Sequence, residues 1–240
     1  MYTEKHKVSY SESSADWAVD IAGIAQYFQD IGAFHSEQCR YGLFELMKQS
    51  RAWILATWQI GVMRYPTYNE EIEIGTAATG FTSLYAEREY AIRDAGGEVL
   101  ARAFARWIML DFESGHPLRM TPDITDHYVM EPSLGMEHLP RRIACREEGE
   151  PQTPFEVFRG CIDTNGHVNN SWYIRFAQNY LPEGFTVRSM RVEYRNAAVL
   201  GDMICPYVIR QDGGIIVKLC AEDKDTYAVI AFYGEKQEKA

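Results

Sequence analysis

Three polar side chains with complementary chemistry stand within five residues of one another: Asp163, Asn165 and His167. An imidazole takes a proton from water near neutral pH, so His167 is a candidate general base. Asp163 could orient that ring and stabilise its charged form, and Asn165 carries both a hydrogen-bond donor and an acceptor. Such a set suits the attack of water on an activated acyl group and requires no metal or organic cofactor.

The segment after these residues predicts a helix. Apolar side chains recur every four residues from Val168 through Tyr180, and Pro182 then ends the pattern. A helix start presents backbone N–H groups and a partial positive charge. The N–H groups near Val168 to Asn170 are therefore candidates for an oxyanion hole, where one donor is typically worth about 3 kcal/mol.

A structural explanation of the same residues stays open. Asp, Asn and Gly are frequent in turns, and Asn169 or Asn170 is an ordinary helix N-cap. Trp172 and Tyr173 then belong to a hydrophobic core rather than to a ligand site.

Composition excludes several classes of protein. The chain has 240 residues and a formal net charge of −10, which argues against binding to nucleic acid or to an anionic membrane surface. The first residues show neither an apolar signal segment nor transit character, and the longest apolar run, residues 54–63, is too short to span a bilayer. We therefore expect a cytoplasmic protein.

The cysteines indicate free thiols rather than a metal centre. Five cysteines are scattered along the chain without a Cys-x-x-Cys motif. His35 and Cys39 stand at helical spacing, as metal ligands sometimes do, but no second pair accompanies them. We expect no metal site.

The order of predicted elements repeats in the two halves of the chain. In the first half we expect a short strand over 8–14, helices over 21–39 and 43–49, and strands over 52–65, 71–79, 83–93 and 99–110. In the second half we expect a strand over 155–162, a helix ending at 181, and strands over 186–196, 203–211, 215–221 and 226–233. Each half thus predicts one long helix beside an antiparallel sheet.

Individual residues extend this repeat. His35 precedes Glu71 by 36 residues and His167 precedes Asp202 by 35. Asp30 and His35 in the first half would then correspond to Asp163 and His167 in the second.

The second-half string resembles the signature of a known family. Asp163-x-Asn165-x-His167-Val168-Asn169-Asn170, followed by Tyr173-Ile174, is similar to the motif of the acyl-ACP thioesterases. In the first half the order of Phe28-Gln29-Asp30, Trp53-Ile54-Leu55 and Arg64-Tyr65-Pro66 is also similar to that family. The resemblance covers roughly residues 8 to 234 and is weakest between the two halves.

This resemblance implies an α+β fold of two tandem hotdog domains, each a long helix wrapped by an antiparallel sheet. We expect an N-terminal hotdog domain over residues 1–115, a linker over 116–152 and a C-terminal hotdog domain over 153–240. The family's catalytic positions match Asp163, Asn165 and His167. The implied reaction is hydrolysis of a fatty acyl thioester on acyl carrier protein, without a cofactor, and the implied partner is that carrier with its acyl-phosphopantetheine.

The resemblance also directs attention to the first half for the acyl chain. It implies that this half selects chain length. The side chains that could line or plug such a tunnel are Phe28, Phe34, Trp53 and Trp58. Each of them is also an ordinary core residue by type.

One departure from the family separates the alternatives. Many members carry a Glu, and plant members a Glu-Cys pair, where this chain has Ala197 and Ala198. Neither alanine can act as acid, base or nucleophile, which disfavours a cysteine nucleophile and leaves attack by water through His167. Glu193 is a candidate substitute for the missing acid. An acyl-CoA thioesterase and a non-catalytic acyl-binding hotdog protein remain alternatives.

Docking of an acidic carrier protein would need a local basic patch, because the chain itself is acidic. Two groups of arginines fit this requirement by sequence: Arg141, Arg142 and Arg146, or Arg188, Arg191 and Arg195. The sequence leaves the oligomeric state open, a homodimer included.

Overall fold

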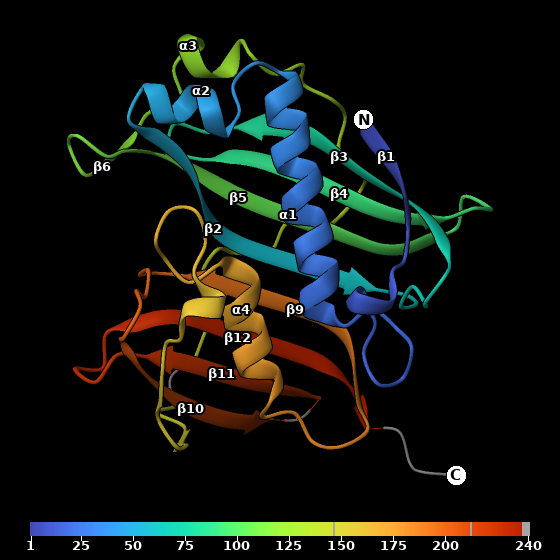
Figure 1. Ribbon diagram of the computed structural model, residues 1–240, viewed down its shortest axis with the longest axis vertical. Coiled ribbons are helices and arrows are strands. Elements are labelled where there is room, and N and C mark those ends of the chain that lie inside the picture. The colour runs from blue at the N-terminus through green and yellow to red at the C-terminus, as the bar shows by residue number, and fades with distance from the viewer. Residues whose placement is uncertain (146, 212, 237–240) are drawn as a thin grey trace. The chain divides into compact units, whose positions relative to one another are not determined.

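The computed structural model describes residues 1–145, 147–211 and 213–236. The chain divides into two compact units, Met1–His138 and Leu139–Ala240, called unit 1 and unit 2 below. Figure 1 shows a helix lying across an antiparallel sheet in each unit. The predicted fold class, α+β with two tandem hotdog domains, is confirmed.

Unit 1 has its sheet in the strand order β1-β3-β4-β5-β2, and β6 pairs with β5. Neighbouring strands are antiparallel throughout this sheet. The elements of unit 1, in chain order, are β1 (Tyr2–Lys7), η1 (Tyr10–Glu12), α1 (Ile21–Gln38), α2 (Leu43–Lys48), β2 (Arg51–Val62), β3 (Glu71–Phe81), β4 (Ala86–Asp94), β5 (Val99–Asp111), β6 (His116–Leu118) and α3 (Pro122–Thr125).

The helix α1 forms where the apolar spacing predicts it. Asp20 caps its first turn by accepting a hydrogen bond from the Gly23 N–H at 2.6 Å. Ile24, Phe28 and Ile31 recur on one face and are at most 2% exposed, so this stripe forms the core against the sheet.

Unit 2 repeats the arrangement with a shorter helix. Its sheet has the strand order β9-β12-β11-β10-β7, and β8 also pairs with β10. Its elements are β7 (Glu150–Pro151), β8 (Phe155–Glu156), η2 (Arg159–Cys161), α4 (Asn170–Gln178), β9 (Phe185–Tyr194), β10 (Met203–Gln211), β11 (Gly214–Cys220) and β12 (Thr226–Lys236).

Two predicted strands are wrong. Residues 8–14 and 155–162 contain the 3-10 turns η1 and η2 rather than continuous strands, and only Phe155–Glu156 pairs in a ladder. In unit 1 the capping box between Ser9 and Glu12 closes the turn locally. Local side-chain bonds of this kind compete with strand pairing, which β-propensity alone does not register.

The two units contain loops of the same backbone geometry before their helices. We call residues 13–20 the unit 1 loop and residues 162–169 the unit 2 loop. The Ser14 N–H bonds to the Ala18 carbonyl at 2.8 Å, and the Asp163 N–H bonds to the His167 carbonyl at 2.8 Å. Bridges Ser13–Val19 and Ile162–Val168 close the loops in the same way.

This match corrects one predicted correspondence. Ala18, and not His35, occupies the place in unit 1 that His167 occupies in unit 2. His35 lies in the last turn of α1, which has 18 residues against 9 in α4. The similar spacings in sequence, 36 and 35 residues, were therefore coincidental, because His35 lies at the end of α1 whereas His167 precedes α4.

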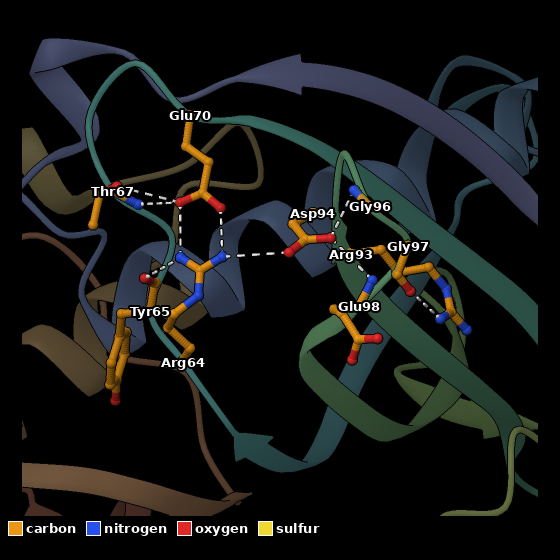
Figure 2. A network of polar contacts seen from close by, with 9 residues as sticks. All are labelled: Arg64, Tyr65, Thr67, Glu70, Arg93, Asp94, Gly96, Gly97 and Glu98. Atoms are coloured by element: carbon orange, nitrogen blue, oxygen red, sulfur yellow. Dashed lines mark hydrogen bonds and ion pairs between the residues drawn. The ribbon is translucent and has the colours of Figure 1, made fainter.

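A short segment, called the facing segment, lies against the loop of each unit: residues 66–70 in unit 1 and residues 198–202 in unit 2. A carboxylate closes this segment in each unit. Figure 2 shows Glu70 accepting a hydrogen bond from the Thr67 N–H, at 2.9 Å, while Arg64 donates to both of its oxygens. Arg64 also lies 3.7 Å from Asp94 in the β4–β5 hairpin (Figure 2). In unit 2, Asp202 accepts from the Val199 N–H at 2.9 Å in the corresponding way.

The boundary between the units lies inside the segment that the sequence predicts as linker, 116–152. Its earlier part is fixed to unit 1 by Glu89, which accepts hydrogen bonds from Ser133 Oγ at 2.6 Å and from the Leu134 N–H at 2.8 Å. His138 also lies 2.9 Å from Glu89 and stacks on Phe104. Among the described residues, no helix has the length and apolar character needed to cross a membrane.

His35 is held neutral in the folded chain, which gives a pH-dependent stability. Burial, and then the nearby Arg88 guanidinium, lower the pKa of His35 from 6.5 to about 4. Between these values the unfolded chain binds a proton that the folded chain excludes, so the free energy of unfolding falls as the pH drops through this window.

We expect His35→Gln, which keeps an acceptor for Arg88, to lose less stability than the wild type across that window. Denaturant unfolding at about pH 7 and about pH 5 measures the difference. Equal losses in the two proteins would show that other groups cause the dependence.

Candidate active site

Asp163 closes the unit 2 loop on itself. Its Oδ1 accepts a hydrogen bond from the Asn165 N–H at 2.8 Å and a longer one from the His167 N–H at 3.4 Å. Gly166, with φ +79°, makes the tight reversal at no steric cost, and its N–H bonds to the Asp163 carbonyl. The contacts of the carboxylate are therefore with the loop backbone, whereas the sequence interpretation placed it against the imidazole.

These contacts predict different results for two substitutions of Asp163. Asp163→Asn keeps an oxygen that accepts the same backbone bonds, so we expect most activity and stability to remain. Asp163→Ala removes the acceptor, and we expect it to destabilise the protein by about 1–2 kcal/mol. Thermal unfolding with parallel turnover assays separates the two, and an inactive but stable Asp163→Asn protein would show that the negative charge itself is needed.

Asn165 and His167 have polar side chains whose hydrogen-bonding groups find no partner among the described residues. Asn165 is exposed and His167 is half-buried. Within the described ranges, neither the amide of Asn165 nor the ring of His167 makes a hydrogen bond. The His167 backbone is nonetheless fixed, because it bridges to Val199 and the next N–H, of Val168, bonds to the Ala198 carbonyl at 2.9 Å. The site thus offers two unoccupied side chains on a rigid backbone.

Unit 1 shows that the turn does not require these residue types. At the positions of Asp163, Asn165 and His167, the unit 1 loop has Ser14, Asp16 and Ala18. The loop still forms, and there the Asp16 carboxylate accepts the Ala18 N–H at 3.2 Å. Even the glycine is replaced, since Trp17 takes φ +67°. A purely structural explanation therefore does not account for the amide and the imidazole in unit 2.

The predicted backbone oxyanion hole is wrong at two of its three positions. The N–H of Val168 bonds to the Ala198 carbonyl and that of Asn169 bonds to the Cys161 carbonyl, both at 2.9 Å. Asn169 is the N-cap, and its side chain accepts the Ser171 N–H at 2.9 Å. The Asn165 amide is the more available donor, because it has no hydrogen-bond partner among the described residues.

Glu193 does not replace the missing acid. Its carboxylate accepts the Ile143 N–H at 3.0 Å and pairs with Arg195 at 3.1 Å. The next residue, Tyr194, points toward α4 and donates to the Asn170 carbonyl, so the alternation of a strand places Glu193 on the opposite face of the sheet. The prediction that Glu193 could serve the site is therefore wrong.

The facing segment is positioned by two residues that the sequence interpretation treated as core or as a repeat marker. The Tyr173 hydroxyl accepts the Ala198 N–H at 2.8 Å from within the core, where the residue is 2% exposed. Asp202 accepts the Val199 N–H at 2.9 Å and the Tyr227 hydroxyl at 3.1 Å. Tyr173 stands in the family motif and Asp202 was noted as a repeat position, but neither signal revealed which backbone groups these residues hold.

The aromatic residues predicted for an acyl tunnel have different environments. Phe28 and Trp58 are at most 2% exposed and pack together at 6.1 Å between ring centroids. Trp53 is partly buried and donates to the Tyr128 hydroxyl at 3.1 Å. Phe34 is 50% exposed, so it does not line the interior of unit 1.

The arginine groups predicted for docking are only partly available. Arg191 donates to the carbonyls of Pro140 and Arg142, and Arg195 pairs with Glu193. Arg146 lies outside the described residues.

In the part of the chain that the structure describes, no group of three or more His, Cys, Asp or Glu residues is arranged to hold a metal ion.

Two family models match most of the chain. The model described as the acyl-ACP thioesterase N-terminal domain matches residues 1–128, and the model of the C-terminal domain matches residues 146–224. The chain belongs to the acyl-ACP thioesterase family. The candidate active site of this family member lies within the second matched range.

Curated relatives agree with this assignment. The chain is 22% identical over 224 residues to "Oleoyl-acyl carrier protein thioesterase 1, chloroplastic" of Arabidopsis thaliana, covering 85% of this chain and 62% of that protein. It is 24% identical over 264 residues to the palmitoyl-acyl carrier protein thioesterase of the same plant, covering 91% of this chain and 62% of the relative. The chain thus spans less than two thirds of the length of these relatives.

Solved structures show the same fold. An acyl-ACP thioesterase from Bacteroides thetaiotaomicron superposes with a TM-score of 0.89 at 18% identity, covering 98% of this chain and 97% of the other. The 12:0-ACP thioesterase from Umbellularia californica gives a TM-score of 0.84 at 15% identity, with the same coverage of the two chains.

Proposed function

We propose that this acyl-ACP thioesterase family member hydrolyses the thioester of fatty acyl-acyl carrier protein and releases a free fatty acid. Family membership supports the reaction class. The observation that carries the proposal is a pair of side chains, Asn165 and His167, that have no hydrogen-bond partner in the described part of the chain and lie on a loop whose copy in unit 1 lacks both.

The proposed chemistry assigns one step to each side chain. His167 takes a proton from water as the oxygen attacks the thioester carbonyl carbon. Asn165 donates a hydrogen bond to the oxyanion of the tetrahedral intermediate. The carbon–sulfur bond then breaks, and the imidazolium returns its proton to the thiolate of the leaving phosphopantetheine. Asp163 acts as a positioning residue that keeps the loop in shape.

The thiol nearest the loop supports attack by water. Cys161 donates its hydrogen to the Phe158 carbonyl at 2.9 Å, and burial raises its pKa. A thiol in this state is a weak nucleophile, because the thiolate is the reactive form. Ala198 beside His167 supplies no nucleophile either.

The experiment compares hydrolysis of acyl-ACP and acyl-CoA of equal chain length, with the free fatty acid identified as the product. We expect a higher kcat/KM on acyl-ACP. A reversed preference would favour an acyl-CoA thioesterase. Binding of both thioesters without release of fatty acid would favour a non-catalytic acyl-binding protein.

We further propose that the partner is the acyl carrier protein with its acyl-phosphopantetheine, that residues 116–152 link the two domains, and that the protein acts in the cytoplasm, alone or as a homodimer. The negative charge of −10 supports neither nucleic acid nor an anionic membrane as a partner. Sedimentation with and without carrier protein would establish both assembly states.

A further inference from the structure

Arg88 of β4 carries a positive charge inside unit 1 and has no ion-pair partner among the described residues. The residue is 8% exposed. Arg64 and Arg106 of the same unit pair with Glu70 and Glu87, respectively. Across the described residues of the chain, no carboxylate forms an ion pair with Arg88.

The groups that Arg88 contacts directly are neutral, and the Glu131 carboxylate, which acts electrostatically on the adjacent His35 ring, pairs with the N-terminal amino group. Its Nη1 donates to His35 Nδ1 at 2.7 Å and to Thr76 Oγ1 at 3.2 Å, and its Cζ lies 5.7 Å from the centre of the Tyr128 ring. The pKa of His35 is lowered to about 4, so this imidazole accepts the hydrogen bond as a neutral ring at pH 7. None of these partners cancels the charge, and an uncompensated buried charge is unfavourable.

One edge of the guanidinium is unused. Neither Nε nor Nη2 makes a hydrogen bond within the described ranges. The fully buried side-chain atoms without a partner there are Tyr27 Oη and Gln178 Oε1, so these two nitrogens of Arg88 retain access to solvent. Two parallel N–H groups on one edge are the arrangement that a carboxylate binds with both oxygens.

The helix facing Arg88 leaves room for its stem. A Cβ at Gly32 of α1 would lie 3.2 Å from Tyr90 Oη and 3.8 Å from Arg88 Cδ. The glycine therefore lets the sheet bring an arginine and a tyrosine close to the helix backbone, where an alanine would press on Tyr90.

We propose that Arg88 forms a carboxylate-binding site in unit 1, in which the ligand carboxylate accepts hydrogen bonds from Nε and Nη2. Two sources have this chemistry: a free fatty acid, such as the proposed reaction releases, and a short carboxylate such as acetate. Binding at Arg88 is measured without turnover, so a failure of this proposal can be distinguished from a failure of the proposed hydrolysis.

The experiment measures binding by calorimetry to wild type, Arg88→Met and the control Arg93→Met. Arg93 is on the same strand, and its guanidinium bonds to the Gly97 carbonyl at the exposed hairpin. The ligands are dodecanoate, dodecanol and acetate. We expect Arg88→Met to bind dodecanoate at least ~10-fold more weakly than the other two proteins, with dodecanol unaffected. If acetate also binds and its binding depends on Arg88, the site is a general carboxylate site. If acetate does not bind, the site is specific for fatty acids.

Equal dodecanoate affinity in wild type and Arg88→Met, or no binding to either, would overturn the proposal. Arg88→Lys provides a second variant should Arg88→Met fail to fold, since lysine keeps the positive charge but lacks the two parallel N–H groups of the guanidinium. We expect Arg88→Lys to bind dodecanoate at least ~5-fold more weakly than wild type. If Arg88→Lys bound dodecanoate with wild-type affinity, the ligand carboxylate would not depend on the two parallel N–H groups of Arg88.

Discussion

Replacing His167 by alanine is expected to lower kcat for thioester hydrolysis by at least ~10², the typical contribution of a positioned general base. The ring makes no hydrogen bond within the described part of the chain, so its loss removes a reactive group and leaves the loop bonds intact. The Asp163–Asn165 backbone contact and the Val168–Ala198 bond do not involve the His167 side chain. We therefore expect KM and the unfolding midpoint to change little.

Steady-state kinetics on an acyl-ACP substrate, with thermal unfolding of the same samples, measures this effect. His6→Ala is a matched control, because it removes the same side chain from β1 of unit 1, where His6 pairs with Glu12. We expect that control to keep wild-type kcat. Full activity of His167→Ala would remove this residue from the mechanism.

The second large effect is expected when the unit 2 loop receives the residues of the unit 1 loop. The exchange is Asp163→Ser with Asn165→Asp and His167→Ala. We expect hydrolysis to fall by ~10² or more, because the proposed base and the proposed oxyanion donor are both removed. The loop should persist, because Asp16 in unit 1 accepts the Ala18 N–H and an Asp at 165 offers the same bond to residue 167.

Circular dichroism and the free energy of unfolding test the structural half of this expectation, and turnover tests the chemical half. A stability within about 1 kcal/mol of wild type would agree with the shared backbone geometry of the two loops. Unfolding of the exchanged protein would instead mean that Asp163, Asn165 and His167 are needed to build the turn.

The helices and most strands could be predicted because their signals are local and periodic. Apolar spacing located α1 within one residue at its end, and the strands β3, β5 and β10 followed from short runs bounded by turns. The segments before the two helices could not be predicted in this way. Their geometry depends on bonds to distant residues, such as the Val157 N–H to the Asp202 carbonyl.

The site was predictable by residue type but not by role. Asp163, Asn165 and His167 stand together in sequence and in the loop, yet the carboxylate accepts hydrogen bonds from the backbone N–H groups of Asn165 and His167 rather than from the imidazole ring. Only the folded structure shows that Glu193 faces away from α4 and that Ala18 is the counterpart of His167. Strand face and loop correspondence depend on register, and a one-residue uncertainty in register reverses the face.

Rescue by free imidazole tests the central claim most directly. His167 is half-buried and its ring has no hydrogen-bond partner within the described ranges, so its removal leaves a space that a small base can enter. The account predicts that fatty acid release by His167→Ala rises with imidazole concentration, while His167→Leu, which fills that space, does not respond. A His167→Ala protein that already works at the wild-type rate, or that stays inactive at every imidazole concentration while still binding acyl-ACP, would contradict it.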